Sequence, residues 1–218
     1  MRKRKELAPS RARRRPYSPK QRKKRFLLYC EGEVTERDYF RDFARFLRSP
    51  LIEVKIAPEW RKDPKRLVEL AKEARSEADR EARLARDDSL RYDEVWCVFD
   101  CDEHTRLKPA IDQATALELG LAVSNPCFDL WLLLHFQDQR AAITTKKAGD
   151  AVRTHVPRYV KHMDFARLAG RGADAVVRAK ELEAQSRRKG ERRGNPTTGV
   201  WRLITKLCED SDVSVSEI

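Results

Sequence analysis

Short apolar runs alternate along this chain with longer segments in which apolar residues recur every three or four positions. The run at residues 26–30 lacks the polar alternation of a half-exposed strand, so it predicts a strand that is buried on both faces. Further strands are expected at residues 51–56, 94–99 and 121–124. The helical period predicts helices at residues 36–47, 64–85, 108–119, 128–136, 146–155, 174–188 and 198–208.

This alternation of strands and helices predicts an α/β domain with a mostly parallel central sheet flanked by helices. Thr35 is expected to cap the first helix, and Asp63 followed by Pro64 is a strong start signal for the second. The segment 128–136 is apolar nearly all round, so this helix should be central and His135 should be a core residue. In such sheets, ligands bind at the carboxyl ends of the strands.

The positive charge of the chain is concentrated at its N-terminus. The net charge is +12, and residues 1–25 hold thirteen Lys or Arg against one acid, so the remainder is formally neutral. We therefore expect a disordered basic tail over residues 1–24 and one folded domain over residues 25–210. Such a tail suits an anionic polymer, with nucleic acid as the simplest partner, although a solubility arm or a protein contact would have the same composition.

Two further classes are disfavoured by composition. No apolar run approaches the ~20 residues of a membrane span, so no membrane association is expected. Cys97 and Cys101 lie near His104, but a structural zinc site normally needs a second ligand pair, and none is visible. The five cysteines are instead typical of a cytoplasmic protein with reduced thiols.

The candidate chemistry lies where two predicted strands end. In "VWCVFDCDEH", Asp100 and Asp102 bracket one residue after an apolar strand, and alternate side chains of an extended chain share a face. Two such carboxylates repel each other unless a cation lies between them, and Mg²⁺ or Mn²⁺ is the natural partner. Glu31 follows the strand 26–30 and would complete the cluster. A metal held there could polarise a phosphodiester and activate water.

Four segments carry a resemblance to a known family: "YCEGEVTERDYF", "VFDCDEH", "SNPCFDLWLLLHF" and "NPTTGVWRLITKL". A strand ending in Glu-Gly, followed by a strand ending in Asp-x-Asp, is similar to the Toprim domain of topoisomerases, bacterial primases and several nucleases. In their order and spacing, the segments resemble the RloB-like proteins over about residues 25–207. Those proteins are prokaryotic, are associated with restriction and phage-defence loci, and are often encoded beside an ATPase partner.

The resemblance implies a Toprim-like Rossmannoid domain and a Mg²⁺- or Mn²⁺-dependent nuclease acting on DNA or RNA in antiviral defence. It assigns Glu31 as a metal ligand or general acid/base and the pair Asp100 and Asp102 as metal ligands. Glu36 and Asp129 are candidates for further ligands. In topoisomerases and primases the second acid lies four residues after the glutamate, a position that is threonine here, so the assignment of Glu36 departs from that pattern.

Other residues are candidates for supporting roles. Lysines of such nucleases often lie near the scissile phosphate, and Lys146, Lys147 and Lys161 are the alternatives here. His104 could protonate a leaving group, or be an incidental loop residue. A basic cluster is expected to clamp phosphates, or to form a solvated loop; it consists of Arg187, Arg188, Lys189, Arg192 and Arg193. The alternative function is a non-catalytic subunit that binds nucleic acid or an ATPase partner.

Overall fold

The computed structural model describes residues 22–59, 63–101, 107–157, 159–161 and 163–218. The predicted basic tail lies outside these residues, apart from its last three positions. The described strands are β1 (Lys24–Cys30), β2 (Ile52–Ile56), β3 (Glu94–Asp100), β4 (Gly120–Asn125) and β5 (Thr197–Thr198). The helices are α1 (Thr35–Leu47), α2 (Pro64–Ala85), α3 (Leu107–Ala116), α4 (Asp129–Leu134), α5 (Thr145–His155), α6 (Gly172–Arg188) and α7 (Val200–Ser211).

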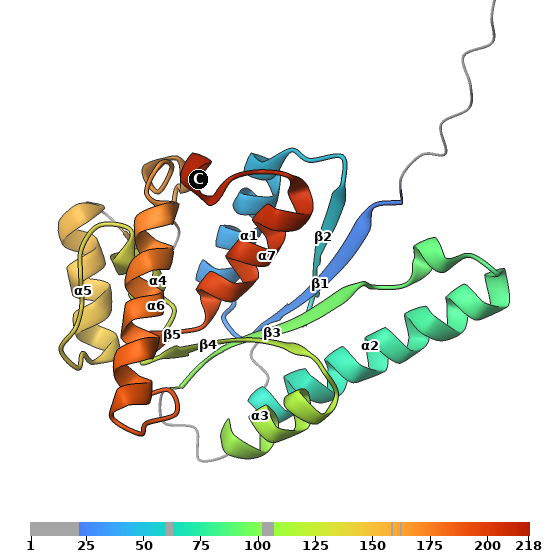
Figure 1. The fold of residues 1–218 in the computed structure, drawn as a ribbon, viewed down its shortest axis with the longest axis horizontal. Coiled ribbons are helices and arrows are strands. Elements are labelled where there is room, and N and C mark those ends of the chain that lie inside the picture. The colour runs from blue at the N-terminus through green and yellow to red at the C-terminus, as the bar shows by residue number, and fades with distance from the viewer. Residues whose placement is uncertain (1–21, 60–62, 102–106, 158, 162) are drawn as a thin grey trace, which may run out of the picture.

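The strands form one sheet in the order β2-β1-β3-β4-β5 (Figure 1). The first four strands run parallel, and β5 pairs antiparallel with the end of β4. The predicted α/β class with a mostly parallel sheet is therefore confirmed. Strand β5 was not predicted: Thr198, expected in the last helix, pairs with Ser124 in the sheet, and α7 begins only at Val200. The helices predicted at 108–119 and 128–136 are also shorter, ending at Ala116 and Leu134.

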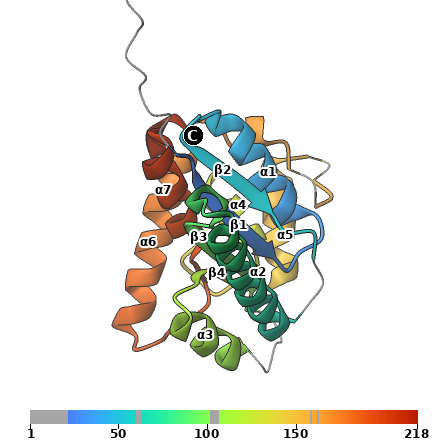
Figure 2. The same ribbon diagram turned by 90° about the vertical axis from the view of Figure 1, so that its right-hand side faces the viewer.

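Helices cover both faces of the sheet. Figure 1 shows α1 and α7 above the sheet and α2 and α3 below it, and Figure 2 shows the same layers from the side. Successive residues of β1 divide between two cores: Phe26 and Leu28 pack on the α1 side, and Leu27 and Tyr29 on the α2 side. Because both faces are covered, the central strands read as continuous apolar runs. Helix α4 is buried at every position, as predicted.

Two of the predicted local signals are confirmed, and one is wrong. Asp63 caps α2, accepting a hydrogen bond from the Arg66 backbone N–H at 3.3 Å. His135 is a core residue, 2 % exposed, with Nδ1 2.9 Å from the Trp131 carbonyl oxygen. Thr35, however, is the first residue of α1 rather than its cap. Its hydroxyl donates instead to the Lys161 carbonyl oxygen at 2.8 Å, and so ties α1 to a distant loop.

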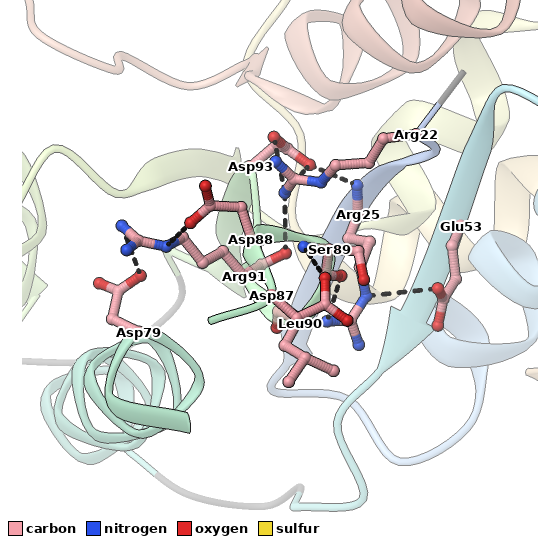
Figure 3. A network of polar contacts seen from close by, with 10 residues as sticks. All are labelled: Arg22, Arg25, Glu53, Asp79, Asp87, Asp88, Ser89, Leu90, Arg91 and Asp93. Atoms are coloured by element: carbon pink, nitrogen blue, oxygen red, sulfur yellow. Dashed lines mark hydrogen bonds and ion pairs between the residues drawn. The ribbon is translucent and has the colours of Figure 1, made fainter. Parts of the chain in front are cut away.

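The amino edge of the sheet is closed by a network of ion pairs (Figure 3). Asp93 accepts hydrogen bonds from the Arg22 side chain at 3.2 Å and from the Arg25 backbone N–H at 2.8 Å. The Arg25 guanidinium also pairs with Glu53 at 3.3 Å, and Arg91 pairs with Asp88 at 3.0 Å. Residues just before β1, which the sequence assigned to the tail, are thus held by the fold.

The chain also extends past the predicted domain end at residue 210. The terminal Ile218 is 2 % exposed, and its carbonyl oxygen accepts a hydrogen bond from Gly172 at the start of α6. Within the described part of the chain, no helix combines the length and the apolarity that crossing a membrane requires.

Candidate active site at the carboxyl edge of the sheet

Glu31 and Asp100 meet at the carboxyl ends of two neighbouring parallel strands. In the register of β1 and β3, Cys30 lies beside Val98, so the chain reaches each acid at nearly the same level. The Glu31 backbone N–H donates to the Val98 carbonyl oxygen at 2.9 Å. The Glu31 Oε2 accepts from the Asp100 backbone N–H at 3.2 Å. The parallel register therefore brings together two acids that lie far apart in the sequence.

Asp129 approaches the same edge from the first turn of α4. Its carboxylate is buried, with the residue 3 % exposed. The Tyr159 hydroxyl donates to Oδ1 at 2.6 Å, and Lys161 Nζ lies 3.4 Å from Oδ2. Burial and the negative charge of Asp129 raise the pKa of Tyr159, so this hydroxyl stays protonated and keeps donating. Asp129 is thus a buried carboxylate that two side chains of one loop hold in place.

Glu36 is the fourth carboxylate of this edge and the one most affected by burial. It is 5 % exposed in the first turn of α1. Burial raises the pKa of Glu36, a backbone hydrogen bond and Lys161 lower it, and the charges of Asp129 and Glu31 raise it again. These influences show that Glu31, Glu36, Asp129 and Lys161 share one electrostatic environment.

Gly32 makes room for Glu36. A Cβ atom at position 32 would lie 1.7 Å from Glu36 Oε2, so any larger residue would displace this carboxylate. Gly32 does not have a positive φ, unlike Gly170 and Gly190. The glycine of the Glu-Gly pair is therefore required for the space it leaves above the backbone, not for an unusual turn.

The thiol of Cys127 lies close enough to both Asp100 and Asp129 for their charges to affect it. Burial raises the pKa of Cys127 to about 12, and the charges of Asp100 and Asp129 contribute to the same shift. Burial also raises the pKa of Cys97 to about 12. Both thiols thus resist forming the thiolate that zinc requires, whereas the carboxylates offer the hard oxygen ligands that Mg²⁺ and Mn²⁺ prefer.

A metal ion of this kind fits the chemistry of the edge, because Glu36 and Asp129 are buried close to further carboxylates, and a cation among them would offset their charges. Among the described residues, no three His, Cys, Asp or Glu side chains are already arranged as a metal site. Asp102 and His104, which the sequence placed at this edge, lie outside the described residues. Glu31, Asp100, Glu36 and Asp129 thus supply the oxygen donors available here.

Of the three candidate lysines, Lys161 is the one whose amine lies at the acids, 3.4 Å from Asp129. Lys146 and Lys147 lie exposed in the first turn of α5. Sequence reasoning missed Tyr159, because a single tyrosine in an irregular loop carries no recognisable signal.

The predicted basic cluster is divided by the structure. Arg187, Arg192 and Arg193 line a pocket of about 650 Å³, together with Arg202 of α7. Arg188 lines a different hollow, and Lys189 is exposed at the end of α6. Sequence reasoning missed Arg202, because it lies among the apolar residues of the last predicted helix.

This arginine-lined pocket adjoins the carboxylates. The Asn125 side chain, at the end of β4, donates to the Arg193 carbonyl oxygen at 2.8 Å. Burial lowers the pKa of Arg193, as do the neighbouring charges of Arg202 and Arg192, while Cys101 opposes them. Since Cys101 directly follows Asp100, the guanidinium of Arg193 and the end of β3 lie near each other.

Comparison with known proteins gives one match. The family model described as RloB-like protein matches residues 26–207. No curated protein and no solved structure matches the chain. Because the family match spans most of the sequence, including both strand-end acids and the arginine-lined pocket, the chain belongs to the RloB-like protein family.

Proposed function

We propose that this protein is a Mg²⁺- or Mn²⁺-dependent nuclease of the Toprim type that hydrolyses phosphodiester bonds of DNA or RNA in antiviral defence. The observation that carries this proposal is the hydrogen bond that Glu31 Oε2 accepts from the backbone N–H of Asp100, the last residue of β3. Two carboxylates at adjacent ends of parallel strands occupy the position at which α/β sheets bind their ligands. Buried Glu36 and Asp129 add negative charge to the same edge.

Glu31 and Asp100 would hold the ion, with Asp102, Glu36 and Asp129 as further oxygen ligands. When bound, such an ion supplies polarisation of the phosphodiester and a water of lowered pKa. Tyr159 keeps the Asp129 carboxylate in a fixed orientation through its 2.6 Å hydrogen bond. Lys161, whose side chain is 60 % exposed, can contact a phosphate oxygen while remaining beside Asp129.

The arginines beside this edge would hold the phosphate backbone. Guanidinium groups bind phosphate oxygens in pairs, and they do so without reading the base sequence. Arg192 and Arg193 lie on the loop that Asn125 fixes to the end of β4. The predicted contribution of Arg188 and Lys189 is smaller, because they do not line the pocket of Arg193.

The test compares purified wild-type protein with Glu31→Gln and Asp100→Asn on labelled plasmid, single-stranded DNA and tRNA. Each reaction is run with Mg²⁺, with Mn²⁺ and with chelator. Glu33→Gln is the matched control, because Glu33 belongs to the same turn but is exposed. We expect metal-dependent cleavage by the wild type and the control, and its loss in both site variants with their folding intact. Equal cleavage by all four proteins would contradict the proposal.

An ATPase partner is also proposed from family membership, so the same reactions are repeated with any ATPase that is encoded beside the gene, with ATP present. If cleavage appears only then, the partner is required for the nuclease. If nucleic acid is bound but never cleaved, with or without the partner, the protein is instead a non-catalytic binding subunit.

A further inference from the structure

The arginine-lined pocket lies along the outer edge of β4, beside the carboxylates but distinct from them. Strand β5 is two residues long and pairs with β4 only at Ser124 and Asn125, so it covers only the carboxyl end of that edge. Both ribbon views place the end of α6 close to α3 on this side of the sheet (Figures 1 and 2). The volume of about 650 Å³ lies within the range of roughly 300–1,000 Å³ that is typical of small-molecule sites.

One wall of the pocket is basic and held in place. Glu183 accepts hydrogen bonds from Arg187, Arg202 and the Trp201 indole N–H. The Arg202 guanidinium also lies 4.7 Å from the centre of the Trp201 ring. These contacts fix the orientation of Arg202 before any ligand arrives, which reduces the entropy lost on binding.

Arg192 and Arg193 are the other two arginines that line the pocket. In the described part of the chain, no carboxylate forms an ion pair with Arg192 or Arg193. Burial lowers the pKa of half-buried Arg193, as do the charges of Arg202 and Arg192, while Cys101 and Glu183 oppose the shift. Like charges gathered in a partly buried site are stabilised by an anion. A phosphate accepts paired hydrogen bonds from guanidinium groups and is therefore a suitable occupant.

Apolar side chains from both faces of the sheet also line the pocket. Trp96 belongs to the core on the α7 face, and Ile111, Leu121 and Val123 belong to the core on the α3 face. The Trp96 ring lies against the backbone of Gly120, where an added Cβ atom would approach it to 2.2 Å. Free phosphate gains nothing from such a lining, whereas a nucleobase packs well against aromatic and aliphatic side chains.

Polar side chains complete the lining of the pocket. They come from Asp112 and Thr115 of α3 and from Thr197 of β5. A ligand with both polar and apolar groups therefore suits the pocket better than a purely apolar one.

We propose that this pocket binds one phosphorylated nucleoside, with its phosphate on Arg193 and Arg202 and its base against the apolar part of the lining. The nucleotide is either free or the phosphorylated end of a nucleic acid strand. The second source rests on the proposed nuclease function, because Asp100 pairs in the sheet with Ser124, one strand from the pocket. A strand end seated here would pass the following phosphates over the carboxylates.

The test measures binding, not cleavage, to the full-length protein by calorimetry in chelator, so its result does not depend on the metal site. The probes are AMP, GMP, inorganic phosphate and adenosine. We expect a nucleoside monophosphate to bind at least about tenfold more tightly than phosphate or adenosine, since its phosphate contacts the arginines and its base contacts the apolar part of the lining. Absence of nucleotide binding to folded protein would overturn the proposal.

Variants locate the binding in the pocket. Arg193→Gln and Arg202→Gln each remove a charged hydrogen-bond donor and should weaken binding by about ten- to a hundredfold. Arg188→Gln is the matched control, because Arg188 lies nearby at the end of α6 but does not line the pocket. Arg192→Gln, at an exposed arginine that also lines the pocket, should weaken binding too and reports independently if Arg193→Gln or Arg202→Gln fails to fold. Equal weakening by Arg188→Gln would show general charge attraction and would overturn the proposal.

The two sources of nucleotide are separated by trinucleotides carrying a 5′-phosphate, a 3′-phosphate or neither. Tighter binding of one phosphorylated trinucleotide than of the free nucleotide identifies a strand end and its polarity. Tighter binding of the free nucleotide identifies a small-molecule ligand. Both results support a phosphorylated nucleoside as the occupant, whereas equal binding of all three trinucleotides, with no preference for a terminal phosphate, would contradict it.

Discussion

The two edges of the sheet contain similar numbers of acids but use them in opposite ways. At the amino edge, Asp93 and Glu53 meet arginines at 3.2 and 3.3 Å, and the charges neutralise each other (Figure 3). At the carboxyl edge, burial raises the pKa of Glu36, and the charges of Asp129 and Glu31 raise it further, against the opposing effect of Lys161. An arrangement that served only stability would resemble the first edge, so the second is where function is expected.

Substitutions at the two edges test this comparison, and Asp100→Asn should have the largest effect. Asparagine keeps the shape of the side chain and leaves unchanged the backbone N–H that donates a hydrogen bond to Glu31. Folding stability should therefore change little, whereas metal-dependent cleavage should fall by more than about 100-fold, since even outer partners of metal ligands contribute 10- to 100-fold. Cleavage assays and thermal unfolding of the same preparation measure the two effects. A variant that loses stability but keeps its activity would place Asp100 among the structural acids.

Acid pH should destabilise the protein from its core rather than from either edge. Burial, with Arg178 and Arg171 nearby, lowers the pKa of His135 to about 4. The unfolded histidine binds its proton near pH 6.5, so the unfolded state takes up more protons between about pH 6.5 and 4, and stability falls over that window. The loss should reach about 3 kcal/mol below pH 4, and above pH 6.5 the contribution is constant.

Denaturant unfolding at several pH values checks this, with His135→Gln as the reference that removes the titration. The carboxylates titrate in both proteins, so only the difference between them reports on His135. The stability advantage of the wild type should shrink as the pH falls from about 6.5 to 4. A difference that stays constant with pH would show that His135 does not resist protonation.

Tyr159→Phe tests whether the carboxyl edge is held together by hydrogen bonds to its acids. The change removes the 2.6 Å bond to Asp129 and leaves Oδ1 buried without this donor. Such a loss typically destabilises a protein by about 1–3 kcal/mol. Chemical denaturation measures the loss, and cleavage by the folded fraction should fall because Asp129 is no longer oriented. Unchanged stability would mean that Lys161 alone suffices to hold Asp129.

The sequence was sufficient to predict the parallel strands and the helices, but not the side-chain contacts that hold the acids in place. Buried strands that end in Glu31 and Asp100 are visible as apolar runs followed by carboxylates, because a parallel sheet forces that pattern. The support of Asp129 by Tyr159 depends on a loop that packs across the fold, and no local period encodes such a contact. For the same reason the basic cluster was read as one clamp, while the packing of α6 against α7 brings Arg202 to Arg193 and leaves Arg188 elsewhere.

Asp93→Asn should have the smallest effect and acts on the amino edge. It weakens the ion pair with Arg22 and the bond from the Arg25 backbone, and both partners are partly exposed. Exposed pairs contribute little, so the loss should be about 1 kcal/mol and should diminish in high salt, which screens the wild-type pair as well. Unfolding at low and high salt measures it, with cleavage by the folded protein unchanged. If activity fell while stability held, the amino edge would also take part in binding nucleic acid, and the division of labour between the two edges would fail.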